Sequence, residues 1–352
     1  MSDWSDGQLG DSMAALDAGV SVNAEDRPHG AGEIGVLKTS AVSGGRFLPQ
    51  ENKAVIERER RLVAESVQGD SILVSRMNTP ALVGESCYVR EAHPSLFLPD
   101  RLWQLKPKDR TKICMRWLSF VLQSAAYRRH VEIHATGTSG SMKNLPKSKL
   151  LELPVSYPAP PEQTEIAEIL DTLDIAIHAT EAIIAKLKAV KQGLLHDLLT
   201  RGIDANGELR SPQAEAPHLY KESPLGWIPK DWEITPLDSV STTVTSGSRD
   251  WARFYADSGA LFVRIGNLTR EHINFRFDST MYVRPPRNGD GQRTRLEPGD
   301  ILISITADLG IVGVVPDGMG EAYINQHIAL VRASHGVVNP RFVGHYLASP
   351  AA

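Results

Sequence analysis

The sequence has few cysteines and no long hydrophobic run. Only Cys87 and Cys114 occur among its 352 residues, too few for a disulfide framework, so a reducing compartment is expected. No run of about eighteen apolar residues is present, which excludes a transmembrane helix. The start, MSDWSDGQLG, is acidic and polar, which argues against a secretory signal. We therefore expect a cytoplasmic protein that does not contact a membrane.

The short motifs of several enzyme classes are also missing. There is no phosphate-binding G-x-x-x-x-G-K-[ST] loop, no Gly-x-Ser-x-Gly nucleophile turn and no Asn-Pro-Pro-aromatic motif of adenine methylases. His130 and His134 have the i,i+4 spacing of metal ligands but lack a third ligand. We predict a protein that is not an enzyme, with no catalytic residue, no metal site and no cofactor of its own.

Acidic residues are scarce in one segment, although the net charge of −4 does not by itself suggest a nucleic-acid binder. Residues 101–149 carry eleven Lys or Arg and only two acids, Asp109 and Glu132. Of the twelve basic residues in 224–352, eleven are arginine, whose forked donors suit phosphates and guanine edges. This distribution indicates nucleic-acid binding, and a solvated basic face is the alternative.

A long helix is predicted after the proline cluster YPAPPEQ (157–163), because Pro160 and Pro161 fit a first helical turn. Residues then recur in alternating steps of four and three, as in a coiled-coil seam. The seam positions are Ile166, Leu170, Leu173, Ile177, Thr180, Ile184, Leu187, Lys191, Leu194 and Leu198. A helix over 161–199 would span roughly 58 Å and would need a partner helix to bury this seam. An ordinary long core helix is the alternative.

The two flanks of this helix resemble each other, in the same order along the chain. The matched pairs are VLKTSAVSGGRF (36–47) with VRIGNLTREHINF (263–275), GDSILVS (69–75) with GDILIS (299–304), LPDRLWQL (98–105) with INQHIALV (324–331), and RWLSFVLQSAA (116–126) with RFVGHYLASPA (341–351). We therefore predict two copies of one mixed α/β (α+β) module. The expected boundaries are 1–155 for the first module, 156–202 for the helix, 203–223 for a linker and 224–352 for the second module.

The second module has no counterpart of TGTSGSMKNLP (136–146) or of the long helix. The chain ends inside an element of the repeat. We expect a C-terminally truncated or partial chain, whose partner helix is missing or comes from another chain.

Several segments resemble a known family. LPVSYPAPPEQTEIAEIL (153–170), with the heptad helix and LLHDLLTRG (194–202), looks like the first central conserved region of the specificity subunit of type I restriction–modification enzymes. LGWIPKDWEITPL (225–237) resembles the start of a target recognition domain there, an opening that the first module lacks. GDSILVS and GDILIS resemble a strand of the same family. The resemblance covers nearly the whole chain.

The resemblance implies two target recognition domains that flank a long coiled-coil-type helix, each reading half of a bipartite site in double-stranded DNA. The helix would fix the spacing and dock methyltransferase subunits, and a restriction subunit would complete a phage-defence complex. S-adenosylmethionine, ATP and Mg are expected on these partner subunits. Two alternatives remain: the recognition subunit of a related methylase–nuclease system, and a coiled-coil scaffold that binds only protein.

Seven residues are candidates for DNA contacts. They are Lys143 and Ser139 in a small-residue loop, Arg76 and Asn78 after GDSILVS, and Arg249, Arg264 and Asn267 near turns and strand ends of the second module. The alternatives are a solvent loop at 136–147 and ordinary turn chemistry at Asn78-Thr79-Pro80. For Arg128 and Arg129, which close a helix, compensation of the helix dipole explains the charge equally well.

Overall fold

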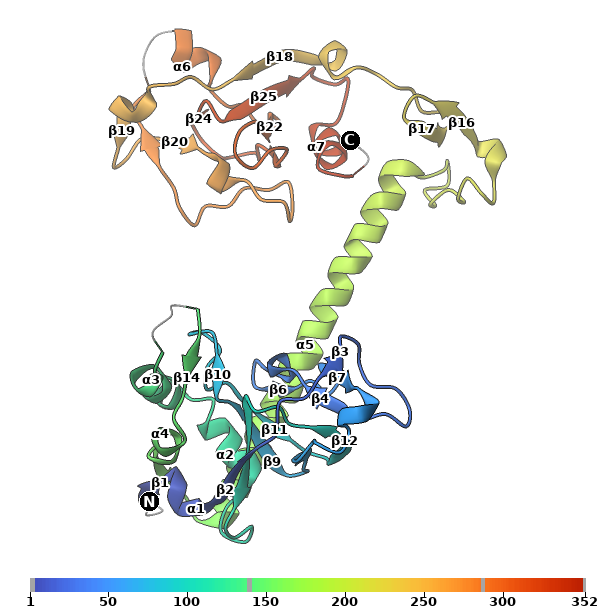
Figure 1. The fold of residues 1–352 in the computed structure, drawn as a ribbon. Coiled ribbons are helices and arrows are strands. Elements are labelled where there is room, and N and C mark those ends of the chain that lie inside the picture. The colour runs from blue at the N-terminus through green and yellow to red at the C-terminus, as the bar shows by residue number, and fades with distance from the viewer. Residues whose placement is uncertain (1–3, 138–140, 286–288, 351–352) are drawn as a thin grey trace. The chain divides into compact units, whose positions relative to one another are not determined.

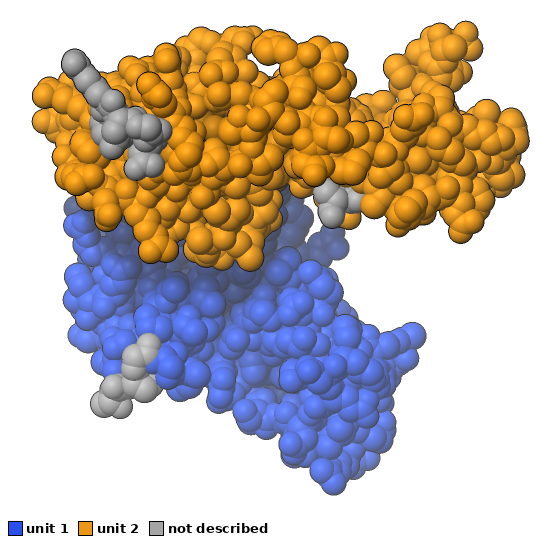
Figure 2. All heavy atoms as spheres, turned by 90° about the horizontal axis from the view of Figure 1, so that it is seen from above, with its two compact units in different colours: residues 1–181 blue, residues 182–352 orange. Residues whose placement is uncertain are grey.

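The computed structural model describes residues 4–137, 141–285 and 289–350 of the chain. Two compact units divide the chain, residues 1–181 and 182–352 (Figure 2). Helix α5 (Pro160–Thr200) contributes its first part to unit 1 and its second part to unit 2. The fold class expected from the sequence, mixed α/β with two modules and a long helix, is confirmed (Figure 1).

The first module is built on an antiparallel four-stranded sheet in the order β11-β9-β13-β2. Its strands are β2 (Met13–Ala18), β9 (Ser71–Ser75), β11 (Ser86–Val89) and β13 (Leu102–Pro107). All five residues of β9 are buried, because the strand lies between two neighbours and both of its faces are covered. The sequence SILVS, rich in β-branched and apolar residues, suits that position.

A second sheet of the first module has the order β3-β7-β4-β12-β8, and β4 and β12 run parallel. Its strands are β3 (Ala24–Glu25), β4 (Gly35–Leu37), β7 (Asn52–Val55), β8 (Ser66–Val67) and β12 (His93–Phe97). Three short ribbons pair β1 (Ser5–Gln8) with β15 (Pro154–Tyr157), β5 (Val42–Ser43) with β6 (Arg46–Phe47), and β10 (Met77–Asn78) with β14 (Lys143–Asn144).

Short helices complete the first module. They are α1 (Leu9–Ser12), α2 (Met115–Val121), α3 (Ala125–His134) and α4 (Lys147–Leu151), with 3-10 turns η1 (Thr39–Ala41) and η2 (Glu57–Glu59). Ser124 caps α3, since its side chain accepts a hydrogen bond from Tyr127 N. Trp117 and Leu118 of α2 are buried in the main core of the unit.

The second module repeats this plan. One antiparallel sheet has the order β18-β25-β22-β23, and the other has the order β19-β21-β20-β24 with β20 and β24 parallel. The strands are β18 (Ser241–Ser246), β19 (Tyr255–Ala256), β20 (Ala260–Val263), β21 (Tyr282–Val283), β22 (Ile301–Ser304), β23 (Val312–Val314), β24 (Ala322–Ile324) and β25 (Ile328–Ala333). The remaining elements of unit 2 are the ribbon β16 (Tyr220–Ser223) with β17 (Gly226–Pro229), α6 (Gly289–Arg293), α7 (Pro340–Leu347), η3 (Pro217–Leu219), η4 (Leu237–Val240), η5 (Trp251–Phe254) and η6 (Ile265–Asn267).

The strand registers make the two modules directly comparable. In the first module Leu102 lies opposite Ser75, and in the second Ile328 lies opposite Ser304. Strands β2, β9, β13 and β11 therefore correspond to β18, β22, β25 and β23, with the same neighbours and directions. Two of the pairs matched in the sequence fall on these strands: GDSILVS with GDILIS on β9 and β22, and LPDRLWQL with INQHIALV on β13 and β25.

The proline cluster begins helix α5 as expected, and Gln163 explains the residues that follow it. Its side chain is 1% exposed: Oε1 accepts from Cys114 N at 2.8 Å, and Nε2 donates to the carbonyls of Lys112 and Pro158. The side-chain amide of Gln163, just after the proline cluster, therefore joins the start of α5 to the start of α2. At the other end Gly202, with φ +61°, ends the helix in the left-handed conformation that glycine favours.

The seam of α5 is mostly open within the described residues. Ile166 and Leu170 are half-buried, and Ile166 packs against the core of unit 1. Six further seam residues are between 45% and 62% exposed: Leu173, Ile177, Ile184, Leu187, Leu194 and Leu198. Of the two polar positions, Lys191 donates from Nζ to the carbonyl of Glu271 at 3.0 Å. No helix in the described part of the chain is long and apolar enough to cross a membrane.

Candidate nucleic-acid interface

In the first module, the end of β9 meets the start of β13. Arg76 N donates to the carbonyl of Arg101 at 3.0 Å, so these two arginines come from neighbouring strand ends. The Arg76 guanidinium lies over the Trp103 ring, 5.5 Å from its centroid. Its Nε is buried and has no hydrogen-bond partner in the described part of the chain. Within the described residues neither arginine has a carboxylate partner, so both charges remain available to a ligand.

The ribbon of β10 and β14 brings together three of the residues that the sequence singled out (Figure 1). Asn78 lies opposite Lys143, and Arg76 directly precedes β10. The Asn78 side chain accepts from Thr79 N and donates to Ser75 Oγ, so it forms the turn. Lys143 Nζ donates to the carbonyl of Gly137 at 3.0 Å. Ser139 lies outside the described residues.

Behind the ribbon, Arg128 holds a loop in place. Its Nη1 donates to the carbonyl of Val83 and its Nη2 to that of Pro80, both at 2.8 Å. Arg129, next to it, is exposed and has no carboxylate partner in the described residues. Arg128 thus fixes the chain after β10, and Arg129 leaves its charge in solvent.

The two spaced histidines contact the backbone. His130 Nε2 lies 2.6 Å from the carbonyl of Lys149, and His134 Nδ1 lies 2.9 Å from that of His130. A search of the described residues finds no group of His, Cys, Asp or Glu side chains arranged to hold a metal ion.

Much of the basic segment 101–149 is neutralised within the first module. Arg110 pairs with Asp70, Arg116 with Asp171 and Asp174, Lys149 with Glu152, and Lys106 with Asp17 and Glu65. Hydrogen bonds that the Lys106 ammonium donates to the carboxylates of Asp17 and Glu65 raise the pKa of Lys106. The charges without a carboxylate within 4 Å, in the parts described, are on Arg101, Lys108, Arg129, Lys143 and Lys147, together with Arg76 outside the segment. A count of charges along the sequence cannot distinguish the basic residues that are paired with a carboxylate from those that are not.

The second module has the same strand junction with other side chains. Ile305 N donates to the carbonyl of His327 at 3.0 Å, which is the counterpart of the bond from Arg76 to Arg101. Thr306 Oγ1 lies 2.6 Å from His327 Nδ1. Arg264 follows the end of β20, and its Nε is buried without a hydrogen-bond partner among the residues described.

Two other candidates of the second module differ in exposure. Arg249 is exposed, beside the bridge that pairs Ser248 with Asn325. Asn267 is 2% exposed; its Oδ1 accepts from Arg264 N, and its Nδ2 donates to two carbonyls. Asn267 therefore supports the turn after β20, and we do not retain it as a DNA contact.

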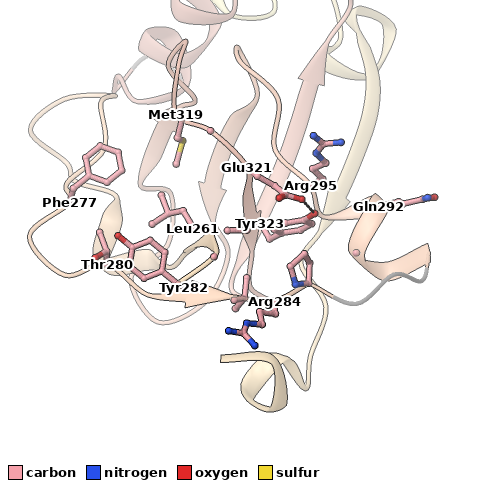
Figure 3. A pocket seen from close by; sticks show the side chains of 16 residues that line it. Leu261, Phe277, Thr280, Tyr282, Arg284, Gln292, Arg295, Met319, Glu321 and Tyr323 are labelled. Atoms are coloured by element: carbon pink, nitrogen blue, oxygen red, sulfur yellow. Dashed lines mark hydrogen bonds between the residues drawn. The ribbon is translucent and has the colours of Figure 1, made fainter. Parts of the chain in front are cut away.

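A cavity of about 1040 Å³ also lies in the second module (Figure 3). It opens beside the starts of the parallel strands β20 and β24, whereas Arg264 follows the end of β20. Tyr323 donates from its hydroxyl to Glu321 at 2.7 Å, and burial together with Glu321 raises the pKa of Tyr323 to about 12. The cavity is thus separate from the strand-end residues.

A model of the type I restriction modification DNA specificity domain family matches residues 1–189, which is more than half of the chain. The chain belongs to this DNA specificity domain family. Among curated relatives, the type I restriction enzyme EcoEI specificity subunit of Escherichia coli is 26% identical over 202 residues, covering 56% of this chain and 33% of the relative. The putative type I restriction enzyme MjaX specificity subunit of Methanocaldococcus jannaschii is 23% identical over 277 residues, covering 78% and 60%. The chain therefore spans less than two thirds of these curated relatives.

A solved structure agrees with the fold of this specificity-domain chain. The S subunit of a type I restriction-modification system from M. genitalium has a TM-score of 0.53 at 15% identity, covering 98% of this chain and 76% of that chain. At this identity the likeness concerns the fold alone.

Three residues at the strand junctions of this specificity-domain chain escaped the sequence reasoning: Arg101, Trp103 and His327. A signal for them was available in the match of LPDRLWQL with INQHIALV, which sets Arg101 against His327 and Trp103 against Ala329. Positions whose residues differ within an otherwise matched repeat indicate where the surfaces of the two modules differ.

Proposed function

We propose that this chain is the DNA-recognition subunit of a type I restriction–modification complex, and that each module reads one half of a bipartite site in double-stranded DNA. The observation that carries the proposal is the family match together with two modules of one strand plan on either side of a long helix. Two similar readers on one chain suit a site with two separate halves.

In this proposal α5 fixes the number of unread base pairs between the half-sites and offers a docking surface for methyltransferase subunits. The exposed seam residues are apolar. Removing their surface from water by packing against a partner would contribute about 25 cal/mol per Å² to the free energy of binding. A helix from a second chain, or from a longer form of this one, would cover part of this area.

Catalysis belongs to the partners in this account. Methyltransferase subunits would use S-adenosylmethionine, and a restriction subunit would use ATP and Mg, so the chain itself acts without a cofactor. We place the assembled complex in the cytoplasm, where the DNA is.

A coiled-coil scaffold that binds only protein accounts for the exposed seam but not for the cations at the strand ends. Phosphate contacts release counterions, so the affinity of a DNA reader falls steeply with salt. A scaffold predicts weak DNA binding with little dependence on salt. The recognition subunit of a related methylase–nuclease system would differ only in its partners.

The test is a map of modified adenines. The full chain is co-expressed with the methyltransferase subunit encoded beside it in a host that lacks adenine methylation, and the methylated positions are read by single-molecule sequencing. We expect a split motif with a fixed gap. Binding of the chain to the methyltransferase with no methylation at any split motif would contradict the proposal.

A further inference from the structure

The two modules share a strand junction whose side chains differ. We infer that each module reads bases at this junction and at the strand end beside it, here together called the reading edge. In the first module its residues are Arg76 and Arg101 of the junction. In the second they are His327 of the junction and Arg264, which follows β20 in the neighbouring sheet. The inference rests on the proposed function and assigns its sequence-reading residues.

Backbone geometry shows that the two edges are equivalent. Arg76 N donates to the carbonyl of Arg101, and Ile305 N donates to the carbonyl of His327, both at 3.0 Å. One turn further, Gly84 N donates to the carbonyl of Ser75, and Gly310 N to that of Ser304. Because the hydrogen-bond pattern is shared, each side chain of the first junction has a defined counterpart at the second.

Two glycines close the edge in the same way. A Cβ on Gly19 would lie 1.6 Å from the carbonyl oxygen of Leu98, and one on Gly247 would lie 2.0 Å from that of Asn325. Each glycine follows the end of its strand, β2 or β18. Both modules therefore hold a third strand end tightly against the junction, which makes the edge a rigid platform.

On this common backbone the side chains diverge. Arg76 is replaced by Ile305, Arg101 by His327 and Trp103 by Ala329. Buried positions keep their character: Ser75 and Ser304 are both fully buried, and so are Ile72 and Ile301. Two half-sites of different sequence require different donors and acceptors at the same places, which is the pattern seen here.

The chemistry of the first edge suits guanine. The fork of an arginine can donate to both O6 and N7 of guanine in the major groove. Stacking on Trp103 restricts the Arg76 side chain, so less rotational freedom is lost on binding.

The second edge presents a different set of groups. Arg264 lies beside Asn325, because Val263 pairs with Ile324 in the parallel strands that end there. His327 contacts Thr306 through Nδ1 and Gln326 through Nε2, at 2.6 and 2.9 Å. We expect the first half-site to contain a guanine read by Arg76, and the second to be read by Arg264 together with His327 and its hydrogen-bonded neighbours.

The test uses the methylation map with variants of the full chain. Arg76→Ala and Arg101→Ala should relax one half of the motif, raising methylation of sites with one changed base about ten-fold relative to the intact motif. Arg264→Ala and His327→Ala should relax the other half. The spacing should stay unchanged in all four variants, since α5 is untouched.

Matched controls separate base reading from general loss of charge. Arg61→Ala removes an exposed arginine of the first module, and Arg284→Ala removes one at the cavity of the second. Neither should change the motif. Arg76→Lys keeps the charge but not the fork, so it should relax the same half as Arg76→Ala, and it replaces the alanine variant if that variant does not assemble.

Each other outcome contradicts the inference. A split motif in the wild type that all four edge variants leave intact would overturn the reading edge but not the proposed function. Uniform loss of methylation at all sites would assign these residues to phosphate contacts only. Relaxation by Arg284→Ala would place reading at the cavity. Absence of any split motif in the wild type would overturn both proposals together.

Discussion

The two modules of this chain have the same backbone arrangement but different side chains. Comparing them shows which features maintain the fold and which belong to the surface. Strand order, direction and register agree between β11-β9-β13-β2 and β23-β22-β25-β18. The shared parts are backbone hydrogen bonds, apolar strand cores and glycines at close approaches. The parts that differ are polar side chains at the ends of strands, where solvent or a ligand lies.

The two modules have different buried polar residues at one equivalent position of the shared fold. Ser71, at the start of β9, donates to the carbonyl of Gln68, whereas its counterpart Asp300 accepts from Arg332 at 2.7 and 2.8 Å. Both residues are 1% exposed. In both modules the buried polar side chain has a hydrogen-bond partner, although the residue type differs.

The equivalence of the modules is tested most strongly at the two glycines. Gly19→Ala and Gly247→Ala should each lower the free energy of unfolding by about 3 kcal/mol, because the new Cβ overlaps a backbone oxygen. Urea unfolding of the full chain, with hydrogen exchange to assign the loss to β2 or β18, measures this.

Gly193→Ala in α5 is the control for both glycine variants. No atom of the described residues lies within 4 Å of its Cβ position, and alanine in a helix interior should stabilise by about 0.5–1 kcal/mol. A large loss at Gly19 with none at Gly247 would break the equivalence of the two edges.

Asp300 tests a difference between the modules. Asp300→Ala should destabilise unit 2 by about 2–3 kcal/mol, since it removes the carboxylate of a largely buried pair and leaves Arg332 with Glu297 and the carbonyl of Arg295. Ser71→Ala, at the same place in the first module, should cost about 1 kcal/mol. Hydrogen exchange of β22 and β9 compares the two directly, and equal losses would show that the ion pair adds nothing.

Gln163 joins α5 to the first module only. Gln163→Ala should destabilise unit 1 by about 2 kcal/mol, because it leaves the Cys114 N–H and two carbonyls without their partner in a buried place. Glu165→Ala, two residues along the same helix and exposed, should have little effect. Faster hydrogen exchange confined to α2 and the start of α5 is the expected signature, and an unchanged rate there would refute it.

His345 should give the smallest effect, and only in unit 2. Burial, with Arg341 and Lys191 nearby, lowers the pKa of His345 below its ordinary value of about 6.5. As pH falls through that value the unfolded chain binds the proton first, so unit 2 loses stability below it. His345→Phe, which installs the aromatic type found in α2 as Phe120, should remove this part of the pH dependence. An identical pH profile in the variant would contradict it.

Much of the fold could be predicted from the sequence. The proline cluster and Gly202 located both ends of α5, because helix starts and stops have local chemistry. The repeat located the corresponding strands β9 and β22, since buried strands carry a compact apolar signal. The short ribbons, such as β10 with β14, could not be predicted, because two-residue strands separated by 64 residues leave no periodic pattern.

The candidate site was less predictable than the fold. Arg76, Asn78 and Lys143 lie close together at the β10–β14 ribbon. The side chain of Asn78, however, hydrogen-bonds within its own turn, and Asn267 of the second module is buried. Whether a cation is free depends on carboxylates distant in sequence, as for Lys106 with Asp17. Tertiary pairing of this kind decides which charges face a ligand, and sequence spacing does not encode it.

The most direct measurement is an experimental structure of the full chain, bound to its methyltransferase subunits and to DNA carrying the methylated motif. The account predicts Arg76 and Arg101 at the bases of one half-site, Arg264 and His327 at the bases of the other, and unread base pairs between them. Bases contacted by other faces of the modules, with both reading edges in solvent, would contradict it.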